Sequence, residues 1–102
     1  MATSSDVWAS GQWTVKAGSE DEFVERWRAW LSWTKDNCAG LRSATLIRAE
    51  DGGQRFISFS DWDDASTRAA WEGSDEFREK MGAVRELCED VQSGNYELAA
   101  GF

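Results

Sequence analysis

The sequence predicts an α+β fold with the element order βαββαβ and a four-stranded antiparallel sheet. Two features of the sequence indicate this fold. Segments that alternate apolar and polar residues are interleaved with segments whose apolar residues recur at helical spacing. Glycines separate most of these segments, which leaves short connections and no linker. With 102 residues, the chain has the usual size of one domain, so we expect residues 1–102 to form a single domain with a flexible N-terminus at residues 1–7.

The first strand is predicted over residues 8–16, where apolar and polar side chains alternate. A helix follows and ends near Asn37, before Gly40. Its start fits a capping box, in which the Ser19 hydroxyl accepts a hydrogen bond from the Glu22 amide. One face of this helix carries an apolar stripe at helical spacing, made of Phe23, Trp27, Trp30 and Leu31.

The next two strands are predicted over residues 41–50 and 55–62. The turn between them contains Gly52 and Gly53, which supply the positive φ of a tight hairpin, so the strands pair antiparallel. Aromatic residues fall on both faces of the second of these strands. We therefore expect neither face of the sheet to be fully solvated.

A short helix is predicted over residues 65–72, and Gly73 ends it. Ser74 then caps a longer helix, whose apolar repeat runs from Phe77 to Cys88. The last alternation gives a terminal strand within residues 95–102. The resulting order is the ferredoxin-like arrangement.

This plan places helices on one face of the sheet, yet the strands carry large apolar groups on both faces. About 100 residues do not suffice to cover the second face. A second copy of the chain does, and a twofold arrangement is the commonest way to bury a self-complementary apolar surface. We therefore expect a homodimer in which two sheets pack face to face, a dimeric α+β barrel.

The composition excludes several classes of function. The chain has no histidine, which removes the hydrolytic triad, the histidine zinc site and the proximal haem histidine. The 11 basic and 19 acidic residues give a net charge of −8, so neither nucleic acid nor an anionic membrane is an expected partner. We expect no metal and no cofactor.

Other features of the sequence bear on its cellular location. Cys38 and Cys88 lie far apart without a CxxC spacing, so we expect two buried thiols rather than a disulfide or a zinc site. No apolar run approaches the length of a membrane span, and the first residues lack the pattern of a signal peptide. A soluble cytoplasmic protein is the default expectation.

Two segments carry a resemblance to a known family. They are GQWTVKAGSEDEFVERW at residues 11–27 and FISFSDWDDASTRAAWEGSDEFREKMGAVR at residues 56–85. In the second segment an acidic turn follows Trp62, and a W-x-x-S-x-x-F helix break runs from Trp71 to Phe77. The chain resembles the antibiotic biosynthesis monooxygenase domains of the dimeric α+β barrel group.

This resemblance implies a function and several site residues. The family includes cofactor-free oxygenases that convert aromatic polyketide phenols or anthrones to quinones, quinol monooxygenases, and a haem-degrading branch. The tryptophan at the position of Trp71 lines the pocket in several members. The haem branch uses a histidine where this chain has Met81 and an asparagine at about Gly11, so haem degradation is disfavoured.

Cofactor-free oxygenation requires a dry pocket, a donor to the developing oxyanion and a path for the proton. We expect Trp71 to be catalytic through its indole ring and N–H group. We expect the donor to the oxyanion to be among Tyr96, Ser58, Ser60 and Arg48. The residues expected to contact the substrate, a small aromatic molecule that reacts with O2, are Trp13, Trp62, Phe77, Met81 and Tyr96.

The proton needs an acceptor, and the carboxylates nearest to the strand end are Asp61, Asp63 and Asp64. The competing interpretation is that this acidic turn only caps the following helix. Two other functions remain open on the same fold. One is a non-catalytic dimeric module that binds an aromatic ligand, and the other is a polyketide cyclase.

Overall fold

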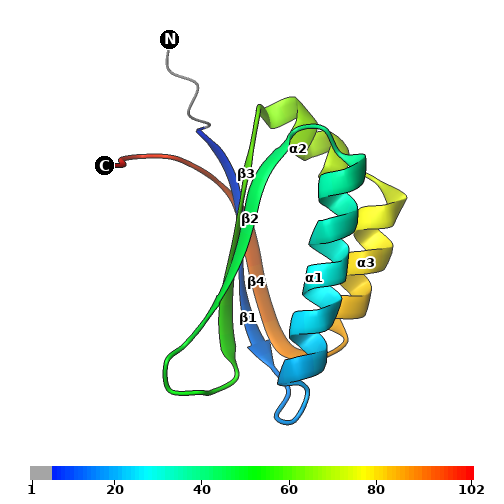
Figure 1. Cartoon of the computed structure of the whole chain (residues 1–102), viewed down its shortest axis with the longest axis vertical. Coiled ribbons are helices and arrows are strands. Elements are labelled where there is room, and N and C mark those ends of the chain that lie inside the picture. The colour runs from blue at the N-terminus through cyan, green and yellow to red at the C-terminus, as the bar shows by residue number, and fades with distance from the viewer. Residues whose placement is uncertain (1–5) are drawn as a thin grey trace.

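The computed structural model describes residues 6–102 as two layers, a four-stranded antiparallel sheet and three helices on one of its faces (Figure 1). The strands lie in the order β2-β3-β1-β4. This confirms the predicted ferredoxin-like fold. The elements are β1 (Val7–Val15), α1 (Glu20–Asn37), β2 (Leu41–Arg48), β3 (Arg55–Trp62), α2 (Ala65–Glu72), α3 (Asp75–Arg85) and β4 (Cys88–Glu97).

The register of the two central strands fixes which side chains face the helices. Gly11 of β1 lies opposite Ser58 of β3 on one side and Ser93 of β4 on the other. Residues directly opposite each other in a sheet share a face. Because Ser58 is buried under the helices, Gly11 and Ser93 belong to that helix-facing surface as well.

The core between the layers is dominated by aromatic rings in contact. Trp30 of α1 meets Trp13 edge-on with ring centroids 6.5 Å apart and stacks on Trp71 at 5.7 Å. Trp71 in turn packs against Trp62, at 4.7 Å. Such pairs stabilise the fold beyond the area that they bury. The layers are therefore held apart by wide, rigid side chains.

Among residues 6–102, no helix covers the other face of the sheet (Figure 1). Ile47 and Ile57 are cross-strand partners on this face and are 49% and 37% exposed. By register Phe59 and Tyr96 also lie on it, with 38% and 56% of their surface exposed. The expected second apolar face is thus present. We call these four residues the outer patch.

The capping box predicted at the start of α1 is wrong. The Ser19 side chain makes no capping hydrogen bond; its carbonyl accepts from the Phe23 amide. The Glu22 carboxylate instead binds Arg26 one turn along the helix. An ion pair at this spacing competes for the carboxylate that the box requires. By contrast, the Ser74 hydroxyl accepts from the Phe77 amide, as predicted.

The predicted bounds also need correction at both ends of the chain. β4 begins at Cys88, not after Gly94, because α3 ends at Arg85 and the Lys16 amide bonds the Leu87 carbonyl. This strand is mostly polar, so its alternation is faint in the sequence. Residues 98–102 lie outside it. Of the N-terminus expected to be flexible, residues 1–5 lie outside the described residues, whereas Val7 already belongs to β1.

Candidate active site

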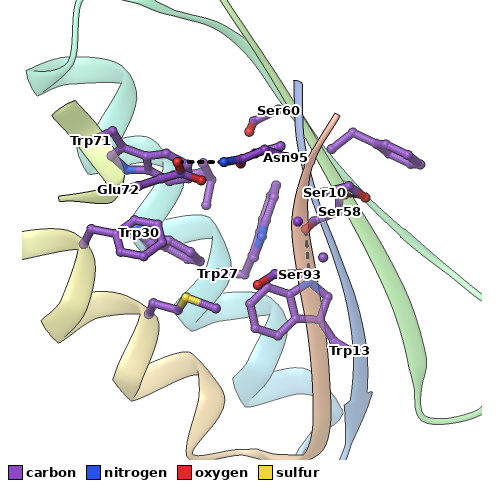
Figure 2. Close-up of a pocket in the computed structure, with 17 residues that line it drawn as sticks. Ser10, Trp13, Trp27, Trp30, Ser58, Ser60, Trp71, Glu72, Ser93 and Asn95 are labelled. Atoms are coloured by element: carbon purple, nitrogen blue, oxygen red, sulfur yellow. Dashed lines mark hydrogen bonds between the residues drawn. The ribbon is translucent and has the colours of Figure 1, made fainter. Parts of the chain in front are cut away.

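A cavity of about 290 Å³ lies between the sheet and the helices (Figure 2). The helices supply its aromatic wall, and the middle of the sheet supplies a floor of small and polar residues. The wall consists of Trp27, Trp30, Leu31, Trp71, Glu72, Phe77 and Met81; the floor consists chiefly of Ala9, Gly11, Trp13, Ser58, Ser60, Ser93 and Asn95.

The structure brings together Trp13, Trp71, Phe77 and Met81, four of the residues predicted for the site, since all of them line this cavity. They come from β1, α2 and α3. The helix break between α2 and α3 sets Trp71 and Phe77 at a right angle, with ring centroids 4.7 Å apart. The W-x-x-S-x-x-F break therefore forms a corner of the cavity.

Two predicted residues lie elsewhere. Trp62 is fully buried behind Trp71, and its indole N–H donates to the Ser60 hydroxyl at 3.1 Å. Tyr96 lies opposite Trp8 in the register, on the outer face of the sheet, and does not line the cavity. The alternation of a strand is the physical reason: Asn95, not Tyr96, shares the helix-facing side with Ala9.

The indole N–H groups of the two predicted tryptophans already have acceptors. Trp13 Nε1 donates to Ser58 Oγ at 3.0 Å, and Trp71 Nε1 donates to Thr34 Oγ1 at 3.3 Å. Thr34 is fully buried in α1 and does not line the cavity. The expectation that the Trp71 N–H serves as an oxyanion donor is thus at odds with this geometry. Both rings contribute carbon surface.

Trp13 also explains the glycine at position 11. A Cβ atom on Gly11 would lie 2.8 Å from Trp13 Nε1, closer than real contacts allow. The indole therefore occupies the space next to position 11. Gly11 and Trp13 form one packing unit of the cavity floor.

Sequence reasoning missed the polar end of the cavity. Asn95 Nδ2 donates to Glu72 Oε1 at 3.2 Å, which joins edge strand β4 to α2 (Figure 2). Glu72 is the single ionisable side chain among the residues that line the cavity, and no lysine or arginine lines it. The register of a strand over residues 88–97 would have revealed Asn95. Nothing in the sequence distinguished Glu72 from the other acidic residues.

The carboxylates predicted as proton acceptors lie outside the cavity. Asp64 caps α2: its carboxylate accepts from the Thr67 amide at 2.8 Å and from the Ser66 hydroxyl at 2.9 Å, and these hydrogen bonds lower its pKa. Asp61 accepts from Ser43, and Asp63 lies 4.0 Å from Arg42. The competing interpretation, a capping turn, is confirmed.

Arg48, another predicted donor, is also remote from the cavity. Its guanidinium donates to the carbonyls of Gly52 and Gly53 and lies over the Phe56 ring.

Within residues 6–102, no three histidine, cysteine or carboxylate side chains gather in a way that could hold a metal ion. In the same part of the chain, no helix combines the length and apolar character needed to cross a membrane.

A second pocket, of about 450 Å³, lies among the end of α1, α2 and the start of α3. Trp71 lines it as well as the cavity. Cys38 is half-buried and lines this pocket, and burial raises the pKa of its thiol. Cys38 and Cys88 form no disulfide, as predicted, but both are half-buried and not buried as expected.

Comparison with known proteins agrees with this architecture. Residues 7–83 match the family model described as antibiotic biosynthesis monooxygenase. SnoaB from Streptomyces nogalater, described as a cofactor-independent oxygenase, superposes with a TM-score of 0.84 at 18% identity, over 96% of this chain and 97% of SnoaB. A conserved protein from Methanosarcina mazei gives 0.78 at 15% identity, over 88% and 89%. No curated protein sequence matches significantly.

Proposed function

Because this chain belongs to the antibiotic biosynthesis monooxygenase family, we propose that it is a cofactor-independent oxygenase that oxidises a small aromatic phenol, anthrone or quinol with O2. The observation that carries the proposal is the cavity lined by Trp13, Trp27, Trp30 and Trp71. Its volume is at the small end of the range for ligand pockets, which is roughly 300–1,000 Å³. The description of SnoaB as a cofactor-independent oxygenase supports the reaction type.

The chemistry draws its electrons from the substrate. An anthrone loses a proton, and the resulting anion reduces O2 and then combines with it. Loss of water from the hydroperoxide completes the conversion of anthrone and O2 to anthraquinone and water. The protein contributes a water-poor aromatic site that holds the ring system and polar groups at one end that contact its oxygen atoms.

The functional unit that we propose is a homodimer. The outer patch, Ile47, Ile57, Phe59 and Tyr96, is left uncovered by the described part of one chain. Its residues come from β2, β3 and β4 and share one face of the sheet, so a second sheet can pack on them around a twofold axis. The proposed occupant is a second copy, because a twofold arrangement lets the same apolar residues of two chains pack on each other.

Two measurements on the same probes test the proposed reaction. We expect anthrones or quinols to quench the tryptophan fluorescence of the protein and to be oxidised with uptake of O2. A non-catalytic binding module quenches but leaves O2 untouched. A cyclase converts a polyketide substrate without O2. Either of these results would contradict the oxygenase.

A further inference from the structure

We infer that Glu72 is the catalytic base that takes the proton from the substrate, and that Asn95 is the positioning residue that orients its carboxylate. This inference rests on the proposed function and adds to it the residue that begins the reaction. The observation behind it is the hydrogen bond from Asn95 Nδ2 to Glu72 Oε1, 3.2 Å long, at the polar end of the cavity.

The location of Glu72 suits a base. It follows Trp71 at the end of α2, and both residues line the cavity, so a ring held beside the Trp71 indole lies close to the carboxylate. Glu72 is half-buried, which gives it access to a ligand and a path to solvent for the proton. A general base must lie within hydrogen-bond reach of the proton that it removes.

Other groups that could accept a proton are excluded by their positions. The Cys38 thiol opens on the second pocket, and Tyr96 lies on the outer face. The Ser58 and Ser60 hydroxyls line the cavity, but each accepts an indole N–H, and a neutral hydroxyl is a weak base. Among the residues lining the cavity, a single carboxylate remains.

Asn95 fixes how that carboxylate is presented. Its amide donates to Oε1, while Oε2 has no hydrogen-bond partner among the described residues. The bond ties α2 to edge strand β4 and limits rotation of the Glu72 side chain (Figure 2). Oε2 is therefore the oxygen that receives the proton.

The step balances without another reactant. The acidic C–H of the anthrone, or the O–H of its phenol tautomer, breaks; the proton goes to Glu72 Oε2, and the electron pair stays on the substrate. The anion then passes one electron to O2 and combines with the superoxide formed. The peroxide anion takes up a proton from solvent, and elimination of water from the resulting hydroperoxide leaves the quinone. The carboxylic acid of Glu72 returns its proton to solvent.

Anaerobic hydrogen exchange isolates this first step from oxygen chemistry. Anthrone is incubated in D2O without O2, and the loss of its acidic C–H is followed by NMR. We expect the wild-type protein to accelerate the exchange and Glu72→Gln to lower the enzymatic rate by about 10²- to 10⁴-fold, the usual contribution of a general base. The glutamine keeps an oxygen to accept from Asn95, so fold and fluorescence quenching should be preserved.

Two further variants sharpen the test. Glu79→Gln removes an exposed carboxylate from the neighbouring helix α3 and should exchange like the wild type. Asn95→Ala should slow hydrogen exchange less than Glu72→Gln does. The reduction in exchange rate caused by Asn95→Ala should be smaller for a more acidic anthrone. A role of Asn95 in stability alone would lower the melting temperature without this dependence on substrate acidity.

The outcomes separate this inference from the proposed function. Wild-type rates of exchange in Glu72→Gln, or no acceleration by a wild-type protein that binds anthrone, overturn the role of Glu72. Uptake of O2 that survives in Glu72→Gln leaves the oxygenase standing without this base. Exchange that depends on Glu72, with no uptake of O2 in air, supports the base and overturns the oxygenase.

Discussion

The indole N–H of Trp71 donates to the hydroxyl of Thr34, and Thr34 in turn donates to the carbonyl of Trp30. Trp71 is the tryptophan most characteristic of the family resemblance. Its indole N–H group is thus directed into the core. Its ring stacks on Trp30 and forms part of the cavity wall. We therefore expect Trp71 to contribute to the proposed site by shape and packing.

Replacement of Trp71 tests this division of roles. Trp71→Phe keeps an aromatic wall but loses the bond to Thr34, so we expect the free energy of unfolding to fall by about 1–2 kcal/mol. Turnover should fall much less than the roughly 100-fold loss typical of a deleted oxyanion donor. Urea unfolding and O2 uptake measure the two effects. A 100-fold loss of turnover in a folded variant would show that the N–H group acts in the reaction.

The close approach of Trp13 to Gly11 predicts that even one methyl group is harmful there. In Gly11→Ala the new Cβ must displace the indole and its bond to Ser58, at a cost of about 1–3 kcal/mol. Anthrone affinity, measured by quenching, should weaken as well. The matched control is Gly82→Ala on α3, whose Cβ meets no atom within 4 Å and should stabilise the helix slightly. Equal stability of the two variants would contradict the packing described for Trp13.

The outer patch predicts an association that a single charge can prevent. Ile57→Lys places an ammonium group in the centre of the proposed interface, beside Ile47, and we expect sedimentation velocity to show a single chain. Ser32→Lys, on the exposed side of α1, should remain dimeric. A wild-type protein that sediments as an 11.5 kDa monomer at working concentrations would refute the dimer.

The cap formed by Asp64 predicts a pH-dependent stability. Its folded-state pKa lies below the unfolded value because the Thr67 amide and Ser66 hydroxyl bind the charged form. The contribution of the charged Asp64 carboxylate to the free energy of unfolding is therefore complete above the pKa that Asp64 has in the unfolded chain. It is lost as the pH falls through the pKa that Asp64 has in the folded protein. Asp64→Ala should lower the melting temperature at about pH 7 and have almost no effect at about pH 2. An equal difference at both pH values would mean that the charged cap contributes nothing.

The sequence predicted the fold well because apolar alternation, helical stripes and the cap at Ser74 all report local preferences. It predicted the apolar part of the cavity lining for the same reason, since Trp13, Trp71, Phe77 and Met81 lie on apolar faces. The polar end depends on tertiary register instead. The alternation of β4 is too weak to show that Asn95 faces the helices, and Glu72 becomes special only where α2 meets that strand.

Trp71 borders the sheet-side cavity and also the second pocket within the helical layer. The indole of Trp71 thus lies between the cavity and the second pocket. We expect a small residue at this position to enlarge both spaces. The size of the side chain at position 71 therefore bears on how long a molecule the cavity can hold.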